Sequence, residues 1–207
     1  MLGIIDYGMG NLFSVSKALE RLDVPYFISE EKEELLKADA LILPGVGAFK
    51  DAMTRLNESG LTEMIHEYAA SGRPLLGICL GMQLLFDESE EHGQTEGLKL
   101  LPGKVIRFPG VTEEGTSYKV PHMGWNLLSF HGTYALTENI REDYAYFVHS
   151  YYAVTEEDVI IAKSKYDKEV PAVVGKENVY GMQFHPEKSS KLGMQLLNNF
   201  TQLMKKG

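Results

Sequence analysis

A single cysteine lies in a setting typical of a catalytic nucleophile. Cys79 is the only cysteine among 207 residues, and residues 77–81 read Gly-Ile-Cys-Leu-Gly where a strand is expected to meet a helix. Glycines two positions before and after a nucleophile permit a tight, strained turn, because side chains there would collide with the adjacent strand or helix. The N-terminus of the following helix favours a thiolate, and the backbone N–H of Leu80 can bind an oxyanion. A buried structural cysteine is the competing interpretation.

A base and a carboxylate that could orient it stand together near the C-terminus. Residues 183–187 read Gln-Phe-His-Pro-Glu and close an apolar run. Alternate residues of an extended chain point the same way, so Glu187 can reach the far ring nitrogen of His185 if the chain stays extended through Pro186. In isolation, a surface histidine beside a salt-bridging glutamate is the plainer interpretation. Together with Cys79, the pair indicates a Cys-His-Glu hydrolytic triad.

The elements that must position these residues can be read from the hydrophobic pattern. Strands are expected over residues 2–6, 24–28, 40–43 and 74–78, and helices over 12–22, 49–70 (interrupted near 59–60) and 80–86, with a short helix or turn at 30–37. This alternation predicts an α/β fold with a doubly wound, mostly parallel sheet flanked by helices.

The second half of the chain changes character. Candidate strands follow one another closely over residues 104–108, 124–130, 145–148, 151–154, 159–164, 172–175 and 179–184. We therefore expect antiparallel strands in the C-terminal half, followed by a last amphipathic helix over 190–203. The stretch 109–118 is interpreted as a surface loop.

Composition narrows the class of protein. The length fits one domain over residues 1–207, and the net charge of -9 without any Lys/Arg-rich run argues against nucleic acid as a partner. One cysteine fits a reducing compartment, and no apolar segment is long enough to span a membrane, so the cytoplasm is the expected location. No cluster has metal-ligand spacing, and no cofactor or metal is expected.

The elbow, the His-Pro-Glu segment and the chain order Cys, His, Glu together resemble the class I glutamine amidotransferases, which are triad glutaminases. The resemblance spans nearly the whole chain and implies that Cys79 attacks the side-chain amide of glutamine. Residues 44–47, Pro-Gly-Val-Gly, match the oxyanion strand of the family. This match implies that a peptide flip around Val46 and Gly47 aims a second N–H at the oxyanion, beside that of Leu80. As bare chemistry, the segment is only a turn.

The same resemblance implies a set of residues that hold the glutamine substrate: Gly45, Gln83, Glu91, His149, Ser150 and Tyr151. Each of them alone is weakly specific, because a glutamine one helical turn from Cys79 or a serine at a strand end is commonly just solvated. Their joint occurrence, in order along the chain, is what carries the implication.

Three segments resemble one subgroup of the family, the glutaminase subunits of imidazole glycerol phosphate synthase. They are residues 5–11 (Ile-Asp-Tyr-Gly-Met-Gly-Asn), 121–126 (Pro-His-Met-Gly-Trp-Asn) and 185–190 (His-Pro-Glu-Lys-Ser-Ser). The resemblance implies a heterodimer with a (β/α)-barrel cyclase, which takes up the ammonia during histidine biosynthesis. It also implies partner contacts through Trp125 as an anchor, together with Asn11, Met123 and Lys188. The sole tryptophan could equally be a core anchor.

Ammonia chemistry also favours a partner. Ammonia released into water at neutral pH is largely protonated and no longer nucleophilic, and 207 residues leave no room for a synthase domain. Three alternatives stay open. The chain could serve another synthase, such as one making anthranilate or pyridoxal phosphate; it could be a regulatory subunit that has lost turnover; or it could be a self-contained cysteine hydrolase acting on esters or peptides.

Overall fold

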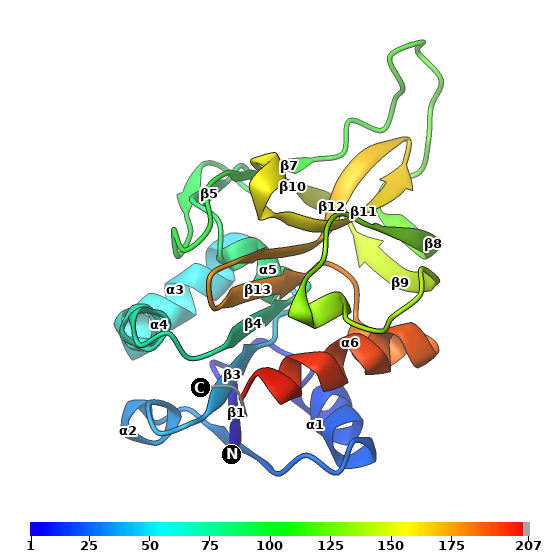
Figure 1. Cartoon of the computed structure of the whole chain (residues 1–207). Helices are drawn as coiled ribbons and strands as arrows, with labels where there is room; N and C mark the ends of the chain where they lie inside the picture. The colour runs from blue at the N-terminus through cyan, green and yellow to red at the C-terminus, as the bar shows by residue number, and fades with distance from the viewer. Residues whose placement is uncertain (205–207) are drawn as a thin grey trace.

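The computed structural model describes residues 1–204, which fold around a nine-stranded sheet in the order β2-β1-β3-β4-β13-β12-β11-β8-β9 (Figure 1). Its strands are β1 (Leu2–Ile5), β2 (Tyr26–Ser29), β3 (Ala40–Leu43), β4 (Leu75–Ile78), β8 (His122–Phe130), β9 (Tyr144–His149), β11 (Ile160–Tyr166), β12 (Lys168–Lys176) and β13 (Val179–Met182). Strands β2, β1, β3, β4 and β13 pair in parallel, whereas β12, β11, β8 and β9 are joined by antiparallel pairing.

The predicted α/β fold is therefore confirmed, although its antiparallel part is larger than expected. The last strand, β13, leaves the antiparallel part and inserts beside β4, with Gly181 opposite Gly77 and Met182 opposite Ile78. Both strands end at the same edge of the sheet. Cys79, which follows β4, and the segment that follows β13 are thereby brought together.

Helices cover both faces of the sheet. They are α1 (Leu12–Arg21), α2 (Lys32–Leu35), α3 (Phe49–Ser59), α4 (Leu61–Ala70), α5 (Leu80–Leu84) and α6 (Ser190–Leu203), with short 3-10 turns η1 (Ala135–Thr137), η2 (Glu157–Val159) and η3 (Pro186–Lys188). The expected interruption of residues 49–70 falls at Gly60, whose φ of 67° is a left-handed conformation that suits glycine. The helix after Cys79 ends at Leu84, two residues earlier than predicted.

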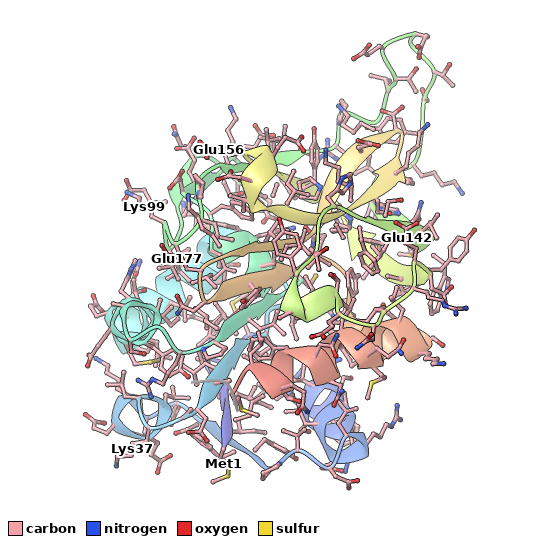
Figure 2. All side chains as sticks on the ribbon, viewed as in Figure 1. Met1, Lys37, Lys99, Glu142, Glu156 and Glu177 are labelled. Carbon is pink, nitrogen blue, oxygen red and sulfur yellow. The ribbon has the colours of Figure 1, made fainter. Side chains whose placement is uncertain are left out.

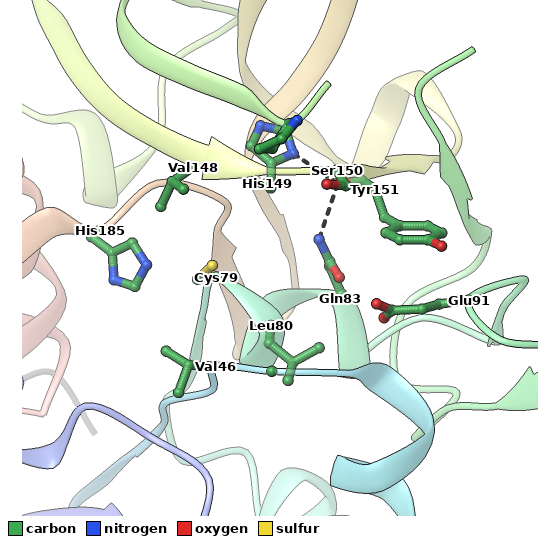
Figure 3. Close-up of a pocket in the computed structure, with 12 residues that line it drawn as sticks. Val46, Cys79, Leu80, Gln83, Glu91, Val148, His149, Ser150, Tyr151 and His185 are labelled. Atoms are coloured by element: carbon green, nitrogen blue, oxygen red, sulfur yellow. Dashed lines mark hydrogen bonds between the residues drawn. The ribbon is translucent and has the colours of Figure 1, made fainter. Parts of the chain in front are cut away.

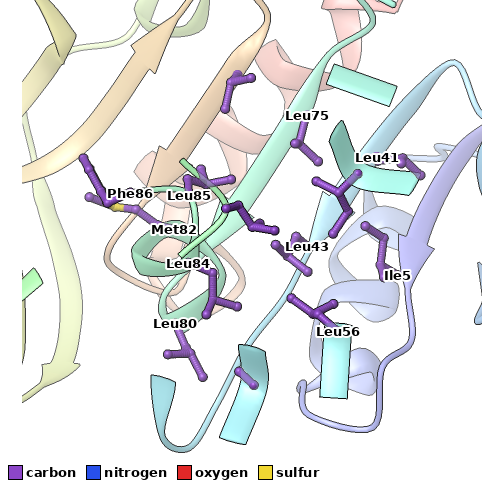
Figure 4. Packing of buried hydrophobic residues seen from close by; sticks show 14 of the residues in the cluster. Ile5, Leu41, Leu43, Leu56, Leu75, Leu80, Met82, Leu84, Leu85 and Phe86 are labelled. Atoms are coloured by element: carbon purple, nitrogen blue, oxygen red, sulfur yellow. The ribbon is translucent and has the colours of Figure 1, made fainter. Parts of the chain in front are cut away.

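The core is double because successive strand residues point to opposite faces. Ile5, Leu41 and Leu75 pack with α3, α4 and α5, as Figure 4 shows for part of this cluster. Ile4 and Leu76, on the opposite face, pack with residues of α1 and α6. Charged side chains such as Lys37 and Glu177 project from the surface instead (Figure 2). This arrangement is the doubly wound packing that the hydrophobic pattern predicts.

A second, smaller sheet lies beside the main one. It has the order β10-β7-β5-β6 and is built from β5 (Glu88–Ser89), β6 (Thr95–Glu96), β7 (Lys104–Arg107) and β10 (Tyr151–Val154). The chain passes from β9 in the main sheet to β10 in the small sheet at Ser150. The expected surface loop 109–118 extends away from the body, closed by a bridge between Val111 and Ser117 (Figure 1, green).

Candidate active site

The turn between β4 and α5 holds Cys79 in a strained backbone conformation. Its φ is 55° and its ψ is −112°, a backbone conformation that residues other than glycine rarely adopt. A Cβ at Gly77 would lie 2.5 Å from the carbonyl oxygen of Gly81, and a Cβ at Gly81 would collide with the carbonyl oxygen of Leu43. The two glycines thus have the steric role expected from the sequence.

His185 and Glu187 form a buried pair beyond the end of β13. Nδ1 of His185 lies 2.9 Å from Oε1 of Glu187. The expectation that the chain stays extended through Pro186 is wrong, because Pro186–Lys188 form a 3-10 turn closed by a 3.0 Å bond from Lys188 N to His185 O. His185 itself is extended, as a residue before proline prefers, whereas the fixed φ of proline suits the first position of a helical turn. Glu187 therefore reaches His185 by folding back.

Strand β9 and the start of α6 hold this histidine from behind. The hydroxyl of Ser189 donates to the carbonyl oxygen of His185 at 2.7 Å and accepts from the backbone N–H of Tyr146 at 3.0 Å. The N–H of His185 in turn points to the carbonyl of Tyr146 at 3.4 Å. Ser189 is fully buried. The backbone of His185, which carries the imidazole, is thus anchored to the antiparallel part of the sheet.

The electrostatic setting of His185 favours its protonated form. Burial lowers its pKa, but hydrogen bonds to Cys79 and Glu187 and the negative charge of these two groups outweigh burial and raise the pKa to about 10. The imidazole therefore carries a proton at neutral pH. It is placed to balance the charge of a thiolate at Cys79 and to give up a proton to a leaving group.

A cavity of about 380 Å³ opens at this edge of the sheet (Figure 3). In Figure 3, Cys79 lies between His185 and Gln83. The structure brings nearly all of the residues predicted for the site to the cavity wall, together with two that sequence reasoning missed, Pro121 and Val148. The predicted residues in the wall are Val46, Gly47, Cys79, Leu80, Gln83, Glu91, His149, Ser150, Tyr151 and His185.

Gly45 and Glu187 are the predicted site residues that lie outside this wall. Glu187 stands behind His185, as an orienting carboxylate should. Gly45 packs against the elbow, where an added Cβ would lie 2.7 Å from the N of Gly81 and 2.8 Å from the hydroxyl of Tyr7. That hydroxyl donates to the carbonyl of Pro44 at 2.9 Å. A hydrogen bond from the buried Tyr7 therefore fixes the start of the predicted oxyanion turn.

Two of the side chains expected to hold glutamine also make bonds within the protein. Nε2 of Gln83 donates to the carbonyl oxygen of Tyr151 at 3.1 Å and to Oε1 of Gln183 at 3.0 Å. Oε2 of Glu91 accepts from the N–H of Phe49, the first residue of α3, at 2.8 Å. Gln83 thus ties α5 to β10, and Glu91 anchors the helix that follows the predicted oxyanion turn.

Sequence reasoning assigned no role to three buried polar residues that support the site. Nε2 of Gln183 lies 4.0 Å from the sulfur of Cys79. Its spacing of two from His185, at the end of a segment predicted to be extended, could have revealed it, because alternate residues of an extended chain share a face. Tyr7 and His122 lie inside segments already singled out, but nothing in their local pattern distinguishes them from core residues.

The residues predicted to meet a partner lie on the surface of adjoining elements. Met123 and Trp125 are two positions apart on β8, and their exposed fractions are 62% and 51%. Lys188 is exposed on η3, and Asn11 caps α1 by accepting from Ser14 N at 3.1 Å. Helix α1 contacts η3, which contacts β9, the partner of β8. These four residues therefore lie along one continuous series of elements.

Residues 1–204 offer neither a membrane span nor a metal site. No helix in this part of the chain is long and apolar enough to cross a membrane. The same residues contain no group of three or more His, Cys, Asp or Glu side chains arranged to hold a metal ion.

Comparison with known proteins places this geometry in context. The family model for glutamine amidotransferase class-I matches residues 3–203. The imidazole glycerol phosphate synthase subunit HisH of Geobacillus thermodenitrificans is 63% identical over 97% of this chain and 94% of its own length. The HisH subunits of Halalkalibacterium halodurans and Bacillus subtilis are 61% and 59% identical, over 100% and 98% of this chain and 98% and 96% of their own lengths.

Solved structures agree on the fold. A crystal structure of a glutamine amidotransferase superposes with a TM-score of 0.77 at 22% identity, covering 99% of this chain and 98% of that one. The glutaminase domain of Trypanosoma brucei CTPS with bound acivicin gives a TM-score of 0.67 at 16% identity, covering 99% and 93%.

Proposed function

Because this chain belongs to the class I glutamine amidotransferase family, we propose that it is the glutaminase subunit of an imidazole glycerol phosphate synthase in histidine biosynthesis. One observation carries this proposal: relatives of that name are about 60% identical over essentially the whole length of both chains. The cavity that contains Cys79 and His185 supplies the chemistry that such a subunit needs.

In the proposed reaction, the sulfur of Cys79 attacks the side-chain carbonyl carbon of glutamine and forms a tetrahedral intermediate. The N–H groups of Leu80 and of the Val46–Gly47 turn stabilise its oxyanion. His185 then donates its proton to the departing nitrogen, so ammonia leaves and a thioester remains. Water, deprotonated by the same histidine, then hydrolyses the thioester to glutamate. This step regenerates the Cys79 thiolate and the protonated His185.

Glu187 has an orienting role in this mechanism. Its carboxylate accepts from Nδ1 of His185 at 2.9 Å, which leaves Nε2 as the ring nitrogen available for proton transfer at Cys79. The raised pKa of His185 suits a group that must hold a proton when the amide bond breaks. The proposed binding groups for glutamine are the cavity residues opposite His185, among them Ser150 and Tyr151.

The proposed partner is a (β/α)-barrel cyclase that uses the ammonia before it meets water. Support comes from the name of the relatives, which are subunits of a synthase, and from the exposed apolar side chains of Met123 and Trp125 on β8. An exposed tryptophan with a methionine beside it is the kind of anchor that protein interfaces favour. Strand β9, which carries Tyr146 behind His185, lies directly beside this surface.

The test is glutamate release from glutamine by three preparations: the purified chain, the chain with the barrel cyclase, and this mixture with the cyclase's phosphoribulosyl formimino ribotide ligand. We expect a large rise when both cyclase and ligand are present, and Cys79→Ala should abolish it. If the two proteins form a complex but release stays at the level of Cys79→Ala, the proposed function is wrong.

A further inference from the structure

The predicted oxyanion turn, residues 44–47, lies between the segments that follow two other strands. Strands β1, β3 and β4 are adjacent and parallel, so the segments that follow them leave the sheet at the same edge. Tyr7 comes shortly after β1, the turn comes directly after β3, and Cys79 comes directly after β4. The turn therefore has Tyr7 on one side and the elbow at Cys79 on the other.

Gly45 is in close contact with both sides. A Cβ built on Gly45 would lie 2.8 Å from the hydroxyl oxygen of Tyr7. The same Cβ would lie 2.7 Å from the backbone N of Gly81 and 2.9 Å from Cβ of Leu80, which belong to the elbow. Because no side chain fits in this gap, the Tyr7 hydroxyl limits how far the turn can move away from Leu80. The N–H of Leu80 is one of the proposed oxyanion donors.

A hydrogen bond makes the contact with Tyr7 directional. The Tyr7 hydroxyl donates to the carbonyl oxygen of Pro44 at 2.9 Å. This carbonyl belongs to the peptide that joins Pro44 to Gly45, so the first peptide of the turn is tied to the β1 side. Burial, and after it the negative charge of Cys79, raises the pKa of Tyr7 above its ordinary value. The hydroxyl therefore keeps its proton and stays a donor.

The far end of the turn has a softer neighbour. A Cβ built on Gly47 would lie 2.9 Å from Cε of Met9, and a methionine side chain is flexible enough to yield. The ring of Tyr7, in contrast, is buried and packed in the core. Val46, between the two contacts, is 43% exposed. The start of the turn is thus held rigidly and its end loosely.

We propose that Tyr7 is a positioning residue for the glutaminase reaction: its hydroxyl holds the Pro44–Gly45 peptide close enough to Leu80 for both oxyanion donors to reach the same oxygen. Tyr7 itself is buried and stands behind the residues that line the cavity. The role deepens the proposed function and rests on it. An oxyanion donor acts in the transition state, so Tyr7 should affect kcat and leave the binding of glutamine unchanged.

The first test removes the hydroxyl and keeps the ring with its packing. In the complex with cyclase and its ligand, Tyr7→Phe should lower kcat for glutamate release about tenfold, because a displaced donor loses part of its stabilisation of the oxyanion. The KM for glutamine should stay at the wild-type value. An unchanged kcat, or a rise in KM without a fall in kcat, would overturn the positioning role.

Tyr68→Phe is the matched control. Tyr68 is a fully buried residue of α4, and its hydroxyl donates to a backbone carbonyl, that of Ala38, at 3.1 Å. Neither residue lines the cavity. The unfolding temperature should fall by about 2–4 °C in Tyr7→Phe, and by no more in Tyr68→Phe, where Arg73 still donates to the Ala38 carbonyl. Equal losses of kcat in the two variants would mean that the role of Tyr7 is merely structural.

A probe of the oxyanion site tests the same role by binding. The probe is the aldehyde analogue of glutamine, in which hydrogen replaces the amide NH₂ group. The thiolate of Cys79 adds to its carbonyl carbon, a C–S bond forms, and the electron pair of the C=O bond moves to the oxygen, as in the tetrahedral intermediate. The inhibition constant of this aldehyde should rise about tenfold in Tyr7→Phe and stay unchanged in Tyr68→Phe.

An inhibition constant that does not change in Tyr7→Phe would overturn the positioning role and leave the glutaminase assignment intact. The proposed function fails separately, if wild-type protein releases no glutamate in the complex.

Discussion

The two halves of the candidate active site stand at the ends of neighbouring parallel strands, yet they are held in different ways. Cys79, after β4, is fixed by backbone sterics: glycines on either side leave room for one tight turn against the carbonyl of Leu43. His185, after β13, is fixed by hydrogen bonds: its carbonyl accepts from Ser189, its Nδ1 donates to Glu187, and its backbone N–H donates to the distant strand β9. Cys79 is thus positioned mainly by close backbone packing, and His185 by long-range hydrogen bonds. Four experiments test this contrast.

The largest effect should come from removing the proposed nucleophile. Cys79→Ala should lower glutamate release in the complex by a factor of about 10⁴ or more, because no other group can form the thioester. The temperature of unfolding should change little, since backbone contacts and not the thiol hold the elbow. Calorimetry and a glutamate assay on the same sample measure both quantities. A large loss of stability would show that the sulfur itself holds the turn.

The next effect tests the backbone sterics directly. Gly81→Ala should lower the free energy of unfolding by about 3 kcal/mol, because its Cβ meets the carbonyl of Leu43, which cannot rotate away. Gly72→Ala is the matched control. Gly72 has a φ of 78° but open space around it, so the cost should be about 1 kcal/mol. Urea unfolding midpoints measure the loss of stability in both variants. Equal losses would show that the elbow is no more tightly packed than an open turn.

The histidine side can be tested through Ser189. Ser189→Ala leaves the N–H of Tyr146 without its acceptor, and should cost about 1–3 kcal/mol of stability and lower kcat in the complex. Ser164 offers a control, because its buried hydroxyl has no hydrogen-bond partner among the described residues. Ser164→Ala should therefore be neutral or slightly stabilising. If both variants keep full kcat, long-range bonds do not position His185.

The smallest effect concerns pH and the antiparallel side of the site. Burial lowers the pKa of His149 to about 3 from 6.5, so the unfolded chain takes up a proton at a higher pH than the folded one. Stability from this group is complete above pH 6.5 and falls on acidification, by at most about 1.4 kcal/mol per pH unit. Urea unfolding between pH 6.5 and 5.5 should show a steeper decline in wild type than in His149→Asn. Equal slopes would mean that His149 titrates alike in both states.

Several features followed from the sequence because they depend on residues close together in the chain. Alternating apolar runs fixed the strands and helices of the first half, and Gly60 broke the long helical run where expected. The glycine spacing around Cys79 predicted its tight elbow, because the steric demand on a turn falls on its nearest residues. The pairing of His185 with Glu187 was also predictable from their spacing, although the turn at Pro186 was not.

Tertiary structure alone decided which distant segments meet. The insertion of β13 beside β4 brings His185 to the cavity that Cys79 lines, and no local pattern specifies that neighbour. The contact between His122 and His149 exists because β8 and β9 pair in a register that places the two residues opposite each other. Strand pairing and register depend on the whole chain, since they are chosen by how both faces of the sheet are buried. Local sterics therefore determined the shape of the turn at Cys79, whereas global packing determined the neighbours that complete the candidate site.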